Sequence, residues 1–310
     1  MMEQVVTIIG APVDVGSRQR GCLMGPDALR VAGLAEALRE QGYRVEDHGN
    51  LALGTRPDVS HGNRAIHHLA ECSGWIDILT KAAFEAGAEG RVATFLGGDH
   101  LMSAGTVAGA ALRAREEGRE QFVLWLDAHT DFHNLATTAS GNLHGTPVAY
   151  FTGQSGFGGA FPPLQAAIDP RNMLMLGIRS VDPAERVRIV EAGVPITDMR
   201  SIDEDGVARP LSRFLDRVRE ANGRLHVSFD VDFIEPAIAP AVGTTVPGGA
   251  TFREAHLIME MLHDSGLVTS LDLAELNPFL DERGRTASLV VDLAASLFGK
   301  RVMDRPTRSY

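Results

Sequence analysis

The sequence predicts an α/β protein of three layers, in which helices cover both faces of a central parallel sheet. Short runs rich in Val, Ile, Leu and Phe recur along the chain, and segments of helical periodicity separate them. Runs that are apolar throughout are typical of strands buried on both faces, and their alternation with helices favours a parallel sheet. The 310 residues, of which 44% are hydrophobic, are enough for one large domain.

The apolar runs predict six strands, and the segments between them predict six helices. We expect strands at residues 5–10, 91–98, 122–129, 172–180, 225–232 and 268–276. We expect helices at residues 26–41, around 76–88, and at 103–120, 209–221, 251–264 and 286–298. Two Gly-rich stretches lack the strand–GxGxxG–helix pattern of a phosphate site. The first, 153–163, is expected to be a flexible surface loop, and the second, 243–249, is a candidate for the rim of a pocket.

Charge and cysteine content narrow the possible partners and compartments. The formal net charge is -11 without a Lys/Arg block, which argues against a nucleic acid or an anionic membrane as partner and suits a small cationic substrate. No apolar run approaches the roughly 20 residues that span a bilayer, and the start lacks the features of a signal peptide. Cys22 and Cys72 are too few for a disulfide framework. We therefore expect a cytoplasmic protein.

Acidic side chains and histidines follow several predicted strands directly. The segment Trp-Leu-Asp-Ala-His-Thr-Asp-Phe at 125–132 places three of them at two-residue spacing, so that they face one way. Ligands of open parallel sheets bind beyond the carboxyl ends of the strands. We therefore expect one site to be formed by His100, Asp127, His129, Asp131, Asp230 and Asp232.

Four carboxylates and two imidazoles exceed what a single cation with an open coordination position needs. Two cations that share ligands fit this set, and such a pair, about 3.5–4 Å apart, turns water into a nucleophile near neutral pH. The oxygen-rich donors favour Mn²⁺ over Zn²⁺. A single Asp-Xaa-Asp at a strand end is more often a turn or a helix cap, so the prediction depends on the whole set.

The motifs that hold these residues resemble those of the arginase and agmatinase (ureohydrolase) family. The matching segments are Gly-Gly-Asp-His at 97–100, Asp-Ala-His-Thr-Asp at 127–131, Ser-Gly-Asn-Leu-His-Gly at 140–145 and Ser-Phe-Asp-Val-Asp at 228–232. The resemblance runs from residue 8 to residue 278. It implies a single domain over residues 1–310 with an eight-stranded parallel sheet, two Mn²⁺ ions per subunit, and a homotrimer or homohexamer.

The resemblance also implies how the ligands divide between the two cations. One ion would be held by His100, Asp127, Asp131 and Asp230, and the other by Asp127, His129, Asp230 and Asp232. Asp127 and Asp230 would then bridge them. The implied reaction is hydrolysis of L-arginine to L-ornithine and urea by a hydroxide between the ions. Asp131 would pass a proton to the leaving amine, His144 would exchange protons with solvent, and Glu275 would hold the guanidinium.

Further positions match residues that contact the amino-acid end of the substrate. Thr138, Ser140 and Asn142 would contact the α-carboxylate, Asp182 with Glu185 would face the α-ammonium, and Thr244 matches a pocket threonine. His133 and Ser180 depart from the family pattern. His133 stands at an α-carboxylate contact where arginases usually carry asparagine, which puts the choice of amino acid in question rather than hydrolysis.

Alternative functions stay open at this point. Agmatine, guanidinobutyrate or another guanidino acid could be the substrate, because only the amino-acid end of the pocket differs. A metal-containing regulatory protein of the same fold belongs to another class, and it is disfavoured because every ligand position is filled. The remaining histidines are expected on the surface: His61, His67 and His68 in a polar loop, and His256 with His263 on a solvated helix face. Arg253 and Glu254 match residues that link subunits in the family.

Overall fold

The computed structural model describes residues 4–55, 58–88 and 90–304 and contains one sheet of eight strands. All neighbouring strands are parallel, in the order β2-β1-β3-β8-β7-β4-β5-β6. The strands are β1 Val5–Ala11, β2 Arg44–Asn50, β3 Arg91–Gly97, β4 Gln121–Leu126, β5 Met173–Ile178, β6 Ile196–Asp198, β7 Arg224–Asp230 and β8 Val268–Ala274. The predicted three-layer α/β class is confirmed.

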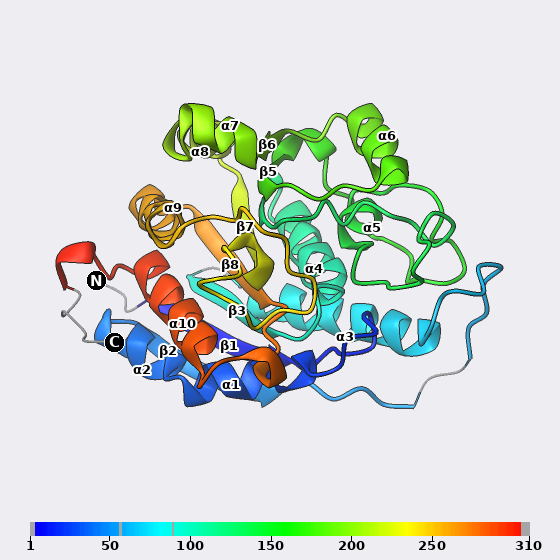
Figure 1. The fold of residues 1–310 in the computed structure, drawn as a ribbon, viewed down its shortest axis with the longest axis horizontal. Helices are drawn as coiled ribbons and strands as arrows, with labels where there is room; N and C mark the ends of the chain where they lie inside the picture. Colours follow the sequence, from blue (N-terminus) through cyan, green and yellow to red (C-terminus); the bar gives the residue numbers. More distant parts are fainter. Residues whose placement is uncertain (1–3, 56–57, 89, 305–310) are drawn as a thin grey trace.

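Helices cover both faces of this sheet (Figure 1). They are α1 Gly25–Val31, α2 Leu34–Glu40, α3 Leu69–Ala86, α4 Met102–Glu116, α5 Pro147–Phe151, α6 Pro183–Ala192, α7 Met199–Asp205, α8 Ala208–Glu220, α9 Phe252–Ser265 and α10 Arg285–Leu297. Short 3₁₀ helices are η1 Cys22–Met24, η2 Pro170–Asn172, η3 Val231–Phe233, η4 Pro278–Leu280 and η5 Val302–Asp304. Helices α2, α10 and α9 pack on one face, and α3 with α4 on the other.

The two edge strands were not predicted, for a physical reason. Strand β2 is largely exposed and reads Arg-Val-Glu-Asp-His-Gly-Asn, while β6 has three residues. An edge strand with one open side does not need to be apolar throughout, so the signal that identified the six inner strands is missing. The short helices α5, α6 and α7 were missed as well.

Other predictions from the sequence are corrected by the structure. The helix expected at 26–41 is two helices, because Gly33 adopts a left-handed φ of 90° between them. The helix expected from residue 76 begins at Leu69. The stretch 153–163 is not simply a surface loop, since Phe157 and Phe161 are buried against Tyr150. His256 is not on a solvated face either: it is fully buried, and its Nδ1 lies 3.0 Å from the Ser296 Oγ.

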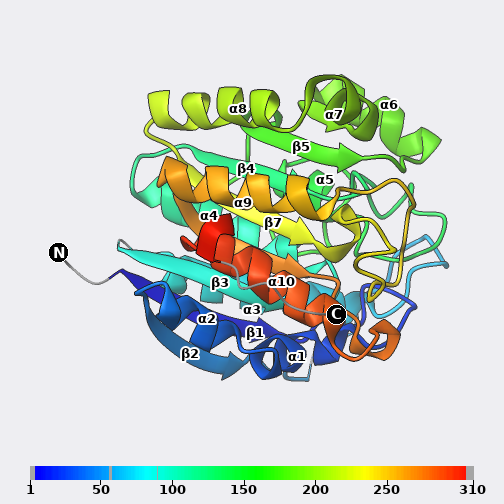
Figure 2. The ribbon, with the colours of Figure 1, turned by 60° about the vertical axis from the view of Figure 1, so that its left-hand side comes forward.

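The order of the strands determines where the site forms. Strands β3, β8, β7 and β4 are consecutive neighbours in the middle of the sheet. Figure 2 shows β3, β7 and β4 between β1 and β5. Because they are parallel, their carboxyl ends lie at one edge, and each is followed directly by site residues. Two hydrophobic clusters, one on each face, hold these strands in place. Among the described residues, no helix is long and apolar enough to cross a membrane.

Candidate active site

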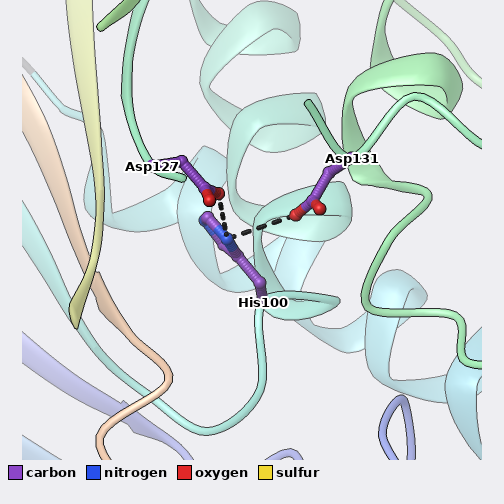
Figure 3. A group of neighbouring side chains, drawn as sticks. All are labelled: His100, Asp127 and Asp131. Carbon is purple, nitrogen blue, oxygen red and sulfur yellow. Dashed lines mark ion pairs between the residues drawn. The ribbon is translucent and has the colours of Figure 1, made fainter. Parts of the chain in front are cut away.

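The six candidate ligands converge at the carboxyl edge of the four central strands, where two overlapping groups form. Asp127, Asp230 and Asp232 are almost completely buried, and so is His100. In the first group, the Nδ1 of His100 lies 3.0 Å from a carboxylate oxygen of Asp127, 3.0 Å from one of Asp230 and 3.3 Å from one of Asp131. Figure 3 shows the His100 ring pointing between Asp127 and Asp131.

The second group forms around His129. Its Nδ1 lies 2.9 Å from Oδ2 of Asp232 and 3.5 Å from Oδ1 of Asp127. Asp127 therefore turns Oδ1 toward His129 and Oδ2 toward His100. Loop hydrogen bonds fix these carboxylates, because the backbone N–H of Ala128 donates to Asp232 and that of Asp232 donates to Asp230. One carboxylate shared between two groups is the arrangement that a pair of cations requires.

A chain of buried hydroxyl groups sets the tautomer of His100. The Asp272 carboxylate accepts a hydrogen bond from the Ser103 hydroxyl at 2.7 Å, so Ser103 in turn accepts from Ser228 at 3.1 Å. With its proton used in this way, Ser228 Oγ accepts from Nε2–H of His100 at 2.8 Å. The Nδ1 lone pair of His100 therefore faces the three carboxylates. Such outer hydrogen bonds are typical of metal-ligating histidines.

The donor set fits a cation, because buried polar atoms at its centre lack partners. Nδ1 of His100 and Oδ2 of Asp127 are inaccessible and make no hydrogen bond of good geometry. Burial alone would lower the pKa of His129, but Asp127 and Asp232 raise it to about 12. Burial opposes a charged ring at His100 too, yet the nearby carboxylates of Asp127, Asp131 and Asp230 raise its pKa well above the ordinary value. The carboxylates therefore stabilise positive charge at this position. Protons on the two histidines carry that charge in the metal-free protein, and a bound cation would replace them.

Metal affinity should consequently depend on pH. Because the pKa values of His100 and His129 are raised, both rings hold an additional proton at neutral pH in the metal-free protein, and a cation must displace it. We expect the affinity for Mn²⁺ to rise with pH, about tenfold per unit for each proton released. Chelator competition at several pH values, together with calorimetry in buffers of different ionisation enthalpy, measures this. An affinity independent of pH, without proton release, would refute it.

Glu275, at the end of β8, connects the metal-binding groups to His144. Its Oε1 accepts from the backbone N–H of His100 and from the imidazole of His144, each at 2.8 Å. The pKa of His144, which burial alone would lower, is raised to about 9 by Glu275 and nearby acids. Glu275 adopts a left-handed φ of 65°, which is strained for a residue with a side chain and is often found at functional sites.

A cavity of about 280 Å³ opens above these groups. Its walls include every residue predicted to contact the amino-acid end of a substrate: His133, Thr138, Ser140, Asn142, Asp182, Glu185 and Thr244. Ser180 and His144 line it as well. Glu275 is buried beneath it, against His100 and His144. The structure thus brings together the predicted pocket residues from four separate segments of the chain.

Within this pocket the His133 ring lies close to two acidic side chains. Its Nε2 lies 3.1 Å from Asp182 and 3.5 Å from Glu185, and its Nδ1 lies 3.1 Å from the Thr137 hydroxyl. Asp182 and Glu185 also form the capping box of α6, which positions them. His133, Asp182 and Glu185 form a third group of potential metal ligands at the rim, although Asp182 is mostly exposed.

Away from the site, Glu254 forms a capping box with Thr251 at the start of α9, and its predicted contact with another subunit stays a prediction.

Several residues of the site were missed in the sequence. Asp99 is fully buried and accepts from the backbone N–H of Gly16, and burial together with the charge of Glu275 raises its pKa to about 7. The Cys22 thiol lies 3.6 Å from Oε2 of Glu275, and burial raises its pKa, so that it stays a donor. Ser228 could have been found, because it lies two residues before Asp230 on the same face. No pattern in the sequence indicates that Cys22 lies near the site.

Fold and site together define an α/β protein with histidine and aspartate metal-binding groups at the carboxyl edge of a parallel sheet. The chain belongs to the arginase family, whose model matches residues 4–299. It is 66% identical over 303 residues to an arginase of Agrobacterium fabrum, with 98% of this chain and 93% of that protein covered. It is 65% identical to an arginase of Brucella melitensis, with 98% and 99% covered. The structure of an arginase from Bacillus caldovelox matches with a TM-score of 0.86 at 37% identity, over 97% of this chain and all of that one.

Proposed function

We propose that the protein is an arginase, which hydrolyses L-arginine to L-ornithine and urea. The observation that carries this proposal is the overlap of two His/Asp groups on Asp127, next to a pocket whose walls carry both acidic acceptors and neutral donors. Family membership and the relatives named above support the substrate. A guanidinium is cationic and resonance-stabilised, so its hydrolysis needs an activated nucleophile and exact placement.

Two Mn²⁺ ions are the proposed cofactor. His100, Asp127, Asp131 and Asp230 would hold one ion, and Asp127, His129, Asp230 and Asp232 the other. The oxygen-rich donor set supports manganese rather than zinc. When bound, the pair lowers the pKa of a water molecule so that it can attack at neutral pH.

The side chains of the protein would orient the substrate. Glu275 offers a buried carboxylate for the guanidinium, held in place by the N–H of His100. Asp182, supported by Glu185, faces the α-ammonium, while Ser140, Asn142 and Thr138 offer neutral donors to the α-carboxylate. Thr244, which donates to Asp232 at 3.3 Å, also lines the pocket.

Asp131 and His144 would move the protons. Burial and the charge of Asp127 raise the pKa of Asp131 to about 6 before a cation binds, which suits a group that receives a proton and passes it to the leaving amine. His144 lines the pocket and donates to Glu275, so it can exchange that proton with solvent. Both buried cysteines are free, which supports a reducing cytoplasm. Family membership supports a homotrimer or homohexamer.

Urea release tests the proposal directly. The manganese-loaded protein is incubated in parallel with L-arginine, agmatine and guanidinobutyrate, and urea is measured. We expect kcat/KM to be highest for L-arginine. A higher kcat/KM for agmatine or guanidinobutyrate would make the protein another amidinohydrolase, and no urea from any of the three would support the regulatory alternative.

Replacing His133 with asparagine is expected to lower KM for L-arginine about fivefold with little change in kcat. The reason is that Nε2 of His133 hydrogen-bonds Asp182, where we place the α-ammonium of the substrate. The shorter asparagine would release this carboxylate. The deamino analogue of arginine keeps the carboxylate but lacks the ammonium, and it serves as the control because its KM should change much less. An equal change for both substrates would contradict the role of His133.

A further inference from the structure

A second cavity adjoins the substrate pocket and has the opposite charge. It has a volume of about 260 Å³ and is formed by the loop after β1, the two residues just before α3 and the segment Gly141–Asn142. Asn142 lines both cavities, and the backbone N–H groups of Leu143 and His144 donate to Gly16, which lines the second one. The loop that carries this cavity is therefore packed directly on the segment expected to bind the substrate α-carboxylate.

Two Arg–His pairs, Arg18 with His67 and Arg20 with His68, line this cavity together with Ser17 and Asn142, and we call it the basic pocket. Nη2 of Arg18 lies 2.7 Å from Nε2 of His67, and Nη2 of Arg20 lies 3.3 Å from Nε2 of His68. A guanidinium can only donate, so both imidazole nitrogens accept. His67 thus holds the Arg18 side chain in place and uses one of its five N–H donors.

Charge in the basic pocket is not balanced. Arg20 pairs with Asp14 at 3.4 Å, but no carboxylate of the described residues forms an ion pair with Arg18. No acidic residue lines the basic pocket, whereas Asp131, Asp182, Glu185 and Asp230 line the neighbouring substrate pocket. Arg18 is exposed and held in place without an acidic partner, so its remaining N–H donors are available to bind an anion.

We propose that the basic pocket is a carboxylate-binding subsite in which Arg18 selects guanidino substrates that carry a carboxylate. This inference rests on the proposed function and names the substrate class. L-arginine has a cationic guanidinium at one end and a carboxylate at the other. The acidic substrate pocket matches the guanidinium end, and the adjoining basic pocket matches the carboxylate end. Arg18 attracts the carboxylate toward Asn142, and the neutral donors of Ser140 and Asn142 bind it. Agmatine, which lacks the carboxylate, gains nothing from Arg18.

Steady-state kinetics of the manganese-loaded Arg18→Gln variant test the proposal. We expect KM for L-arginine to rise at least about threefold, with kcat for L-arginine and both constants for agmatine unchanged. Arg18→Lys should restore part of the loss. His67→Ala, which frees the Arg18 side chain, should resemble Arg18→Gln. High salt should reduce the difference between the parent protein and the variant, because exposed charges are screened.

Arg64→Gln is the matched control, because Arg64 lies in the segment before α3 but outside the basic pocket, and it should change neither KM. Equal changes for both substrates in Arg18→Gln would indicate a structural effect and overturn the proposal, as would no change for either. Succinate, a free dicarboxylate, tests whether the basic pocket binds a separate carboxylate ligand instead of the substrate. The proposal is overturned if Arg18→Gln abolishes succinate binding but leaves KM for L-arginine unaltered, because the pocket would then be an effector site. Failure of the proposed function is a distinct result, since the parent protein would then release no urea from L-arginine.

Discussion

Replacing Asp230 with alanine is expected to remove both cations and to lower kcat/KM for L-arginine by at least about a thousandfold. Asp230 lies at the end of β7, and its Oδ2 is 3.0 Å from Nδ1 of His100. We propose that it bridges the two ions, so its loss removes a ligand from both and leaves Asp127 as the only shared carboxylate. Metal analysis after extensive dialysis, combined with the urea assay, measures the effect.

The experiment must distinguish a loss of metal binding from a loss of folding stability. Burial and the neighbouring charges of Asp232 and Asp127 raise the pKa of Asp230, so ionising this carboxylate costs the metal-free protein stability. We therefore expect the metal-free variant to melt at the same temperature as the metal-free parent, or higher. Asp216→Ala, which removes an exposed carboxylate on α8, is the control and should keep both ions. A variant of Asp230 that retains two Mn²⁺ ions would contradict the bridging role.

Replacing Glu275 with glutamine is expected to lower kcat/KM by at least about a hundredfold while the metal content stays at the value of the parent protein. The substitution keeps the shape of the side chain and the oxygen that accepts from the N–H of His100. It removes the negative charge that we place opposite the guanidinium, and with it a charge-assisted pair in a buried position.

The combination of lost activity and retained metal distinguishes Glu275 from the ligands. It should appear with L-arginine and with agmatine alike, because both carry the guanidinium. Glu191→Gln, on the exposed surface of α6, should behave as the parent protein does. Full activity of Glu275→Gln would exclude a role in guanidinium binding, and loss of metal would show that Glu275 acts through the N–H of His100 instead.

The inner part of the fold was predictable because burial on both faces leaves a simple pattern. The strands that bear the site are buried along nearly their whole length and rich in Val, Leu and Phe, and each is followed within three residues by Asp, His or Glu. The spacing of Asp127, His129 and Asp131 placed them on one face, and the order of strands in the sheet then brought His100 and Asp230 to them. These contacts follow from strand geometry, while the roles of the residues stay predictions.

Features that depend on long-range packing could not be predicted in the same way. The mainly polar edge strand β2 carries no apolar signal, and the burial of His256 depends on Ser296 from α10. The contact of Cys22 with Glu275 joins residues that are 253 positions apart. His133 was predicted as a carboxylate contact from its position in a motif, but only the structure revealed that Asp182 and Glu185 lie within reach of its ring.

Anomalous diffraction from a crystal of the manganese-loaded protein locates the metal ions themselves. We expect two manganese peaks per subunit, about 3.5–4 Å apart, with Asp127 and Asp230 between them. His100 should ligate one ion and His129 the other, and the group of His133, Asp182 and Glu185 should hold none. A single peak, or a second ion at His133 rather than His129, would contradict this expectation.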